Sequence, residues 1–197
     1  MNRSFQKEFA VFAVFAAKRY NERMTKNTDL YYATWPTAWG PMGGVWGPDG
    51  LERIVLPHYQ PDELAALLAW EHPKAAKDDR PFEVLIARCR EYFNRKPVDF
   101  LDIPCRMPAE GTLAGLVYRQ CRLIPPGQTR SYTQLATLIG QPDSARAVAS
   151  ALGRNNIPLV IPCHRVRYAD GKLGGFSAPG GVNVKQRLLD LEKGAAT

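Results

Sequence analysis

The spacing of apolar and polar residues changes about halfway along this chain of 197 residues. From residue 31 to residue 56, β-forming residues are interrupted by glycine, proline and tryptophan, and "GPDG" at 47–50 is a turn signal. This pattern predicts strands joined by tight turns, and therefore a small sheet. Two later stretches, 61–70 and 82–93, carry apolar residues at helical spacing, so the first half is predicted to contain helices as well.

An extended connector rich in proline, residues 95–108, leads to a mostly helical second half that begins near Gly111. Close to the end of the chain, Asn183 and Gln186 form a capping pattern for a final helix, which Gly194 stops. These features predict an α+β protein. Its expected parts are an N-terminal extension of unknown role (1–27), an N-terminal α/β domain (28–110) and a C-terminal domain (111–197).

Two short helices are predicted in the middle of the second half. Ser131 and Gln134 form a capping box that opens the first of them, and Gly140 closes it. After a turn, Asp143 is the expected N-cap of a second helix that runs through Leu152. Two helices joined in this way are typical of a helix-turn-helix unit.

The second helix of this pair is expected to have a flat outer face. Helical spacing turns one set of residues inward, namely Ala145, Val148, Ala149 and Leu152, and another set outward, namely Arg146, Ala147, Ser150 and Ala151. A helix that reads base edges needs Arg, Asn or Gln on its exposed face, and Arg146 is the one long donor here. The face suits close, sequence-indifferent contact with DNA, although an alanine-rich helix packed on a neighbour fits the pattern equally well.

Composition adds a preference for a polyanionic partner. Twenty-six Lys and Arg against nineteen Asp and Glu give a net charge of +7, which favours nucleic acid but is weak evidence alone. The four cysteines form no CxxC pair and no cluster with metal-ligand spacing. We therefore expect a reducing compartment, no disulfide framework and no zinc.

An apolar run near the N-terminus, residues 9–17, requires a separate interpretation. It is far shorter than the roughly 20 residues that span a bilayer. It could be the core of a signal peptide, but Glu8 lies at its edge, and the thiols favour a cytoplasmic protein. An appended amphipathic helix, or a true translation start at Met24, is the preferred interpretation.

The stretch "IPCHRV", residues 161–166, carries candidate chemistry. A free thiol has a pKa of about 8.5, so Cys163 needs a base to react as a thiolate at neutral pH. His164 is the obvious base, but adjacent residues of an extended strand point in opposite directions, so a turn or a bridging water would be needed. Glu192 could orient the histidine, because an acid in the last helical turn opposes the helix dipole. For the tripeptide PCH alone, a buried structural cysteine remains the favoured interpretation.

Three longer motifs occur in one order in the second half: "IPPGQTRSYTQLA", "ARAVASALGRNNIPLVIPCHRV" and "DGKLGGFSAPGGVNVKQRLLDLEKG". In their order and spacing they resemble the O6-alkylguanine-DNA alkyltransferases, also called methylated-DNA–protein-cysteine methyltransferases. The resemblance is strong over residues 124–194, and it extends to the first half only in general layout. It implies a small RNase H-like sheet domain followed by a mainly helical, winged helix-turn-helix domain.

The resemblance also implies roles for the residues around the thiol. Cys163 corresponds to the alkyl acceptor, which attacks the O6-alkyl carbon in line and keeps the group as a thioether. His164 would deprotonate it through a water, and Glu192 would hold that histidine. Asn155 resembles the asparagine that ties the turn between the DNA-binding helix and the active-site segment.

Further positions are implied to contact DNA or the flipped base. Arg146 resembles the finger that replaces the extruded nucleotide in the stack, since an alkylated O6 cannot be reached inside a duplex. Tyr132 resembles the tyrosine that assists nucleotide rotation and helps to protonate the leaving guanine. The remaining matches are Pro158, Val166 and Ser177 in the guanine pocket, the last two through backbone groups, and Lys185 near the leaving group.

The implied function is single-turnover DNA repair without a cofactor, by a monomer acting on double-stranded DNA that carries O6-alkylguanine. Leu113 and Ala114 replace a Phe-Gln pair that is common in the family, and no cysteine precedes Cys89, so the zinc site of some eukaryotic members is absent. The nearest alternative is a damage sensor that binds without repairing, but such proteins replace the acceptor that Cys163 provides. A helix-turn-helix regulator is disfavoured by the flat helix, and a cysteine hydrolase by the lack of an oxyanion-hole motif.

Overall fold

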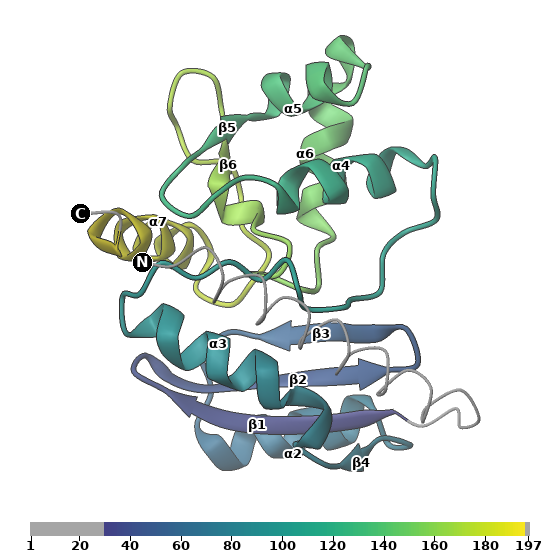
Figure 1. Cartoon of the computed structure of the whole chain (residues 1–197), viewed down its shortest axis with the longest axis vertical. Coiled ribbons are helices and arrows are strands. Elements are labelled where there is room, and N and C mark those ends of the chain that lie inside the picture. Colours follow the sequence, from purple (N-terminus) through teal and green to yellow (C-terminus); the bar gives the residue numbers. More distant parts are fainter. Residues whose placement is uncertain (1–29, 196–197) are drawn as a thin grey trace, which may run out of the picture.

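Strands of the first half form a four-stranded sheet (Figure 1). The computed structural model describes residues 30–195. Its first strands are β1 (Tyr31–Thr37), β2 (Gly40–Gly47), β3 (Gly50–Val55) and β4 (Ala76–Lys77). The first three pair as antiparallel neighbours, β4 joins β1 in parallel, and β3 is an edge strand. The predicted sheet and its turn at 47–50 are confirmed; Gly50 has a φ of 102°, which favours glycine.

Two helices cover opposite faces of this sheet. They are α2 (Pro61–Glu71) and α3 (Glu83–Phe93), the latter preceded by the 3-10 turn η1 (Arg80–Phe82). Leu64 and Leu68 of α2 pack with Val45 and Val55, while α3 packs into a larger core on the other face. The two helices predicted at 61–70 and 82–93 are thus confirmed, with small differences at their ends.

The connector is held between the sheet and the helical half. Leu51 on the edge strand β3 donates its N–H to Pro104 and accepts from Arg106, each at 2.9 Å. From the other side, Arg122 of α4 (Leu113–Arg122) donates to three connector carbonyls at 3.0 Å. The connector is therefore fixed by bonds that one strand and one helix supply.

The second half carries the remaining elements, which Figure 1 shows stacked along the β3 edge of the sheet. The helices are α5 (Tyr132–Leu138), α6 (Ala145–Gly153) and α7 (Gly181–Ala195). Short pieces are β5 (Arg130–Ser131), η2 (Pro142–Ser144), η3 (Cys163–Arg165) and β6 (Val166–Arg167). This sheet domain followed by helices confirms the predicted α+β class. Within residues 30–195, no helix is long and apolar enough to cross a membrane.

Helix starts agree with the sequence in one case and differ in two. The Ser131 capping box is confirmed, with both reciprocal bonds to Gln134 present at 2.7 and 3.0 Å. Asp143 is not an N-cap, because residues 142–144 form their own 3-10 turn and α6 begins at Ala145. Asn183 is likewise not a cap, because the glycine turn before it lets α7 begin at residue 181.

The outer face of α6 is narrower than its sequence predicts. Arg146, Ala147 and Ser150 are exposed as expected. Ala151 was expected to face outward, but it is only 1% exposed. The reason is that α4 and α5 both pack against α6, and Tyr118 of α4 donates its hydroxyl to the Ala151 carbonyl at 3.2 Å.

The expectations for the N-terminal extension, residues 1–27, and for its apolar run lie outside the described residues. The division of the chain into the three expected parts stays a prediction.

Candidate active site

Cys163 begins the 3-10 turn η3, at the end of a buried apolar stretch. Two backbone bonds shape this turn: Cys163 donates its N–H to Ile161 at 2.8 Å, and Arg165 donates to Pro162 at 2.9 Å. The segment is therefore not the extended strand that would point neighbouring side chains in opposite directions. Within residues 30–195, however, no direct hydrogen bond joins the side chains of Cys163 and His164.

Asn155 ties the end of α6 to the thiol. Its side-chain amide donates to Cys163 Sγ at 3.1 Å and to the Ile161 carbonyl at 2.8 Å, while its oxygen accepts from Ile157 N at 2.9 Å. All three bonds are buried, so the amide is satisfied and fixed. Burial raises the pKa of the Cys163 thiol, and the Asn155 bond only partly opposes this. The group is thus a neutral thiol until a base removes its proton.

His164, the residue after the thiol, forms a buried pair with Glu192. His164 Nε2 lies 2.7 Å from Glu192 Oε1, and both side chains are fully or almost fully buried. Burial lowers the pKa of His164 more than the nearby carboxylate raises it, so the ring is neutral at physiological pH. Burial alone would raise the pKa of Glu192, but bonds from His164 and Arg165 outweigh it and hold that pKa far below its usual range.

These charge states decide which nitrogen of His164 carries the proton. An ionised carboxylate only accepts hydrogen bonds, so Nε2 must be the protonated nitrogen. Nδ1 is then a lone-pair acceptor, and it is buried without a protein hydrogen-bond partner among the described residues. The arrangement leaves one basic nitrogen free, next in sequence to a thiol that needs a base.

Three further residues donate to Glu192, and none of them was predicted from the sequence. Arg165, itself 2% exposed, donates from Nε and Nη2 at 2.8 to 3.1 Å. The Tyr92 hydroxyl donates to Oε1 at 2.7 Å, and Gly127 N donates to Oε2 at 3.1 Å. Arg165 lies inside the "IPCHRV" motif, so its closeness could have been suspected. Tyr92 lies 100 residues from its partner, where no local pattern reaches.

Tyr132 and Lys185 lie together against a glycine. The ammonium of Lys185 is 5.9 Å from the centre of the Tyr132 ring and 3.5 Å from the Gly174 carbonyl. A Cβ at Gly174 would collide with the Tyr132 hydroxyl, so this close approach requires glycine. Burial raises the pKa of Tyr132 to about 12, so it remains a neutral phenol that can donate a proton. Lys185 is completely buried, and burial lowers its pKa.

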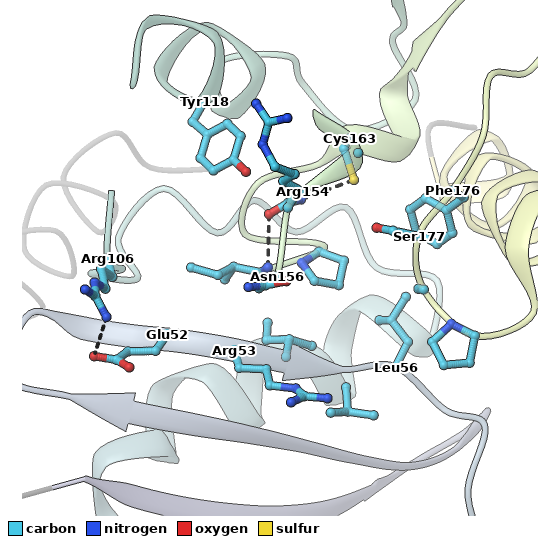
Figure 2. A pocket seen from close by; sticks show the side chains of 18 of the residues that line it. Glu52, Arg53, Leu56, Arg106, Tyr118, Arg154, Asn156, Cys163, Phe176 and Ser177 are labelled. Atoms are coloured by element: carbon cyan, nitrogen blue, oxygen red, sulfur yellow. Dashed lines mark hydrogen bonds and ion pairs between the residues drawn. The ribbon is translucent and has the colours of Figure 1, made fainter. Parts of the chain in front are cut away.

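A pocket of about 620 Å³ opens onto Cys163. Figure 2 shows Cys163 and Tyr118 on one side of it and the strand that carries Glu52 and Arg53 on the other. Pro158 and Ser177 line it as the sequence predicts, and Phe176 and Tyr118 line it without having been predicted. Tyr132, Val166 and Lys185 are not part of its wall. The structure thus brings the thiol and two predicted pocket residues together around one cavity.

The exposed face of α6 lies outside this pocket. Arg146 and Ala147 are solvent-exposed, and within residues 30–195 Arg146 makes no hydrogen bond or ion pair. Ser150 accepts a bond from Arg154 Nη1 at 2.8 Å, so Arg154, which does line the pocket, extends the same face. Because Arg146 has no protein partner among residues 30–195 and its neighbours on α6 are small, a binding partner can approach this face of the helix closely.

Known proteins share both the motif region and the fold. The family model "6-O-methylguanine DNA methyltransferase, DNA binding domain" matches residues 113–194. The methylated-DNA–protein-cysteine methyltransferase of Haemophilus influenzae is 33% identical over 168 residues, which cover 84% of this chain and 88% of the relative. The Mycobacterium bovis relative of the same name is 50% identical over 80 residues, 41% of this chain, so the match spans about half (47%) of that relative.

Solved structures give the same answer for the fold. The crystal structure of Mycobacterium tuberculosis O6-methylguanine methyltransferase has a TM-score of 0.68 and 31% identity, covering 85% of this chain and 95% of that one. A crystal structure of the same bacterium's protein in complex with DNA has a TM-score of 0.69 at 31% identity, covering 84% and 94%.

Fold and site together define an α+β protein in which a buried thiol follows a pair of short helices and is next in sequence to the histidine of a histidine–carboxylate pair. The extent and identity of the match to the Haemophilus influenzae relative show its family. The chain belongs to the methylated-DNA–protein-cysteine methyltransferases.

Proposed function

We propose that this protein repairs DNA by moving the alkyl group of O6-alkylguanine onto Cys163 in a single, irreversible turnover. The observation that carries this proposal is the bond from Glu192 to His164, which leaves Nδ1 without a protein partner among residues 30–195, in the residue next to a thiol that opens into a pocket. Family membership supports it, because the Haemophilus influenzae relative is named for this activity. The protein needs no cofactor for the transfer, because the thiol itself is the acceptor.

The proposed reaction begins with removal of the thiol proton. Glu192 holds the Nε2–H of His164, and Nδ1 takes the proton of Cys163 through a bridging water. The Asn155 amide already donates to Sγ, and that bond becomes charge-assisted when the thiolate forms.

The thiolate then attacks the O6-alkyl carbon in line. A sulfur–carbon bond forms while the carbon–oxygen bond breaks, and the electron pair stays with the guanine oxygen. The neutral Tyr132 hydroxyl gives a proton to the departing guanine. The proton that His164 took from Cys163 then passes through water to Tyr132, so that in all one proton moves from the thiol to the guanine. The thioether product is stable, so each molecule reacts once.

Other proposed roles concern the flipped guanine. Pro158 and Ser177 form walls of the pocket beside Cys163, and backbone groups of Ser177 and Val166 would bind the base edge. Lys185 is a buried cation close to Tyr132, so it would stabilise negative charge that develops on the leaving group.

We propose that duplex DNA binds across the exposed face of α6. Ala147 and Ser150 permit close approach of the helix to the minor groove, where little sequence is read. Arg146, exposed and without a protein partner among residues 30–195, would fill the gap that the flipped nucleotide leaves. Ala151, which the sequence suggested as a further contact, is buried and is excluded from this surface.

The protein would act as a monomer, in the cytoplasm, consistent with four unpaired cysteines.

The proposed transfer is tested by mass spectrometry. After incubation with an oligonucleotide that carries O6-methylguanine, the peptide containing Cys163 should gain the mass of one methylene group, and the lesion should become unmodified guanine. An unmodified peptide together with an intact lesion would refute the proposed function.

Arg146→Ala tests the proposed finger. Because unstacking a base costs a few kcal/mol and each 1.4 kcal/mol is tenfold in rate, repair of duplex DNA should slow by roughly tenfold or more. Reaction with free O6-benzylguanine, which needs no flipping, should change by less than about twofold. Single-turnover rates with both substrates measure this.

Arg90→Ala is the matched control for the finger experiment, because Arg90 is an exposed arginine on α3, away from α6. Its removal should leave both rates unchanged. Equal slowing of duplex and free-base reactions by Arg146→Ala would argue against a finger role.

A further inference from the structure

We infer that Tyr92, a residue of the N-terminal half, is a positioning residue for the Glu192–His164 pair. This inference rests on the proposed function, in which that pair deprotonates Cys163. Tyr92 lies on α3, which packs against the sheet, while Glu192 lies on α7, in the other half of the chain (Figure 1). The half of the chain that carries the thiol motif therefore does not supply every contact of the Glu192–His164 pair.

The contact is direct and falls on a shared atom. The Tyr92 hydroxyl donates to Glu192 Oε1 at 2.7 Å, and His164 Nε2 lies 2.7 Å from the same oxygen. Tyr92 is 2% exposed, so water does not compete for this bond. Arg165 also donates to this oxygen, from Nε and Nη2 at 3.1 and 2.8 Å. Hydrogen bonds to one oxygen share its electron density, so the loss of one strengthens the others.

The direction of the bond follows from the charge states. Glu192 is ionised and can only accept. Burial, and then the adjacent carboxylate, raise the pKa of Tyr92 well above its usual value, so the hydroxyl keeps its proton and donates it. Tyr92 therefore acts on Glu192 as a fixed, uncharged donor at every physiological pH.

The Tyr92 ring holds this donor in one place. It packs edge-on against Phe93 and Phe100, with ring centres 5.2 and 5.7 Å away. Phenylalanine at position 92 would keep these contacts and remove only the hydroxyl. The chain thus permits a substitution that separates the hydrogen bond from the packing.

Removing the hydroxyl should strengthen the bond between Glu192 and His164. The charged and titratable groups facing Glu192 are His164 and Arg165 from η3 and Tyr92 from α3; Gly127 N adds a neutral donor. His164 also experiences the charge of Lys185 on α7. With one donor fewer, Oε1 becomes a stronger acceptor for His164, which favours the imidazolium form and raises the pKa of the ring.

A protonated His164 cannot accept the thiol proton, so Tyr92 keeps the base in its working form. The acid limb of the rate–pH profile should therefore move to higher pH in Tyr92→Phe. We expect a shift of about half a pH unit, because only part of the free energy of one charge-assisted bond is redistributed to His164. A purely structural role for Tyr92 would lower the active fraction without moving the limb.

The decisive measurement is proton NMR of the His164 ring together with the rate profile. The chain has three histidines, and only His164 is buried, so its Nε2–H is protected from exchange; His164→Asn confirms the assignment. In Tyr92→Phe this resonance should move further downfield, and the acid limb for O6-benzylguanine should shift upward. Tyr32→Phe, which removes a hydroxyl on the far face of the sheet, should change neither.

Each result decides one of the two proposals. An Nε2–H resonance unchanged by Tyr92→Phe would overturn the positioning role, whatever the alkyl-transfer rates are. A parent protein that takes up no alkyl group would instead refute the proposed function, and the NMR comparison would still decide whether Tyr92 controls the His164–Glu192 bond.

Discussion

Cys163→Ser should abolish alkyl transfer while leaving DNA binding intact. A serine hydroxyl is far less acidic than a thiol, and the neutral His164 is too weak a base to ionise it, so the rate should fall by at least about a thousandfold. The exposed face of α6 is untouched, so affinity for a duplex carrying O6-methylguanine should stay within about twofold. Single-turnover assays and fluorescence anisotropy at fixed salt measure the two quantities.

Cys105→Ser provides the matched control for loss of a thiol. Cys105 lies in the connector, where its sulfur accepts from Arg122 at 3.4 Å, a contact that a serine oxygen can also accept. This variant should transfer the alkyl group at the parental rate. Alkylation found on any peptide of Cys163→Ser would mean that another group accepts the alkyl, and would contradict the assignment of Cys163.

Two parts of the site that were predicted from the sequence, the Ser131 capping box and the closeness of Asn155 to Cys163, are set by local chain geometry. The capping box at Ser131 depends on residues three apart, and both of the hydrogen bonds that it predicts are present. Asn155 and Cys163 are eight residues apart, within one turn between a helix and the following segment. Residues that are close in sequence have few possible relative positions, so a short motif largely determines the geometry of its own side chains.

Residues that the sequence did not reveal depend on packing between distant segments. Tyr92 reads as an apolar position in an amphipathic helix, and nothing near it in the chain shows that its hydroxyl meets Glu192. Ala151 was placed outward from helical spacing alone, whereas α4 and α5 both pack against α6 and Ala151 is buried. In each case the burial of the residue and its partners depend on how many elements pack against its helix and from which side. Helical periodicity contains no information on either point.

Glu192→Ala should cause the largest loss of stability among substitutions in the site. It would leave the Arg165 guanidinium buried without its anion, and a buried charge that loses its partner typically costs about 3–5 kcal/mol. The hydroxyl of Tyr92 and the N–H of Gly127 would lose an acceptor as well. Urea unfolding followed by tryptophan fluorescence measures the change in unfolding free energy, since Trp35 and Trp46 are buried.

The contribution of Glu192 to stability should depend on pH. Bonds from His164 and Arg165 outweigh burial and hold the pKa of Glu192 below its ordinary value of 4.5, so the folded state binds fewer protons there than the unfolded chain. The stabilisation by Glu192 is therefore complete above pH 4.5 and is lost as the pH falls below it. The difference in stability between parent and Glu192→Ala should shrink over that acidic range, and a constant difference would contradict the carboxylate's role.

A double variant separates the lost ion pair from the lost packing. In Glu192→Ala/Arg165→Met no guanidinium remains to be stranded, so the protein should recover at least about 1 kcal/mol relative to Glu192→Ala alone. Alkyl transfer should not recover, because His164 would still lack the acceptor that fixes its proton on Nε2. Recovery of stability without recovery of transfer would show that Glu192 does two separable things: it neutralises a buried arginine and it sets the tautomer of the base.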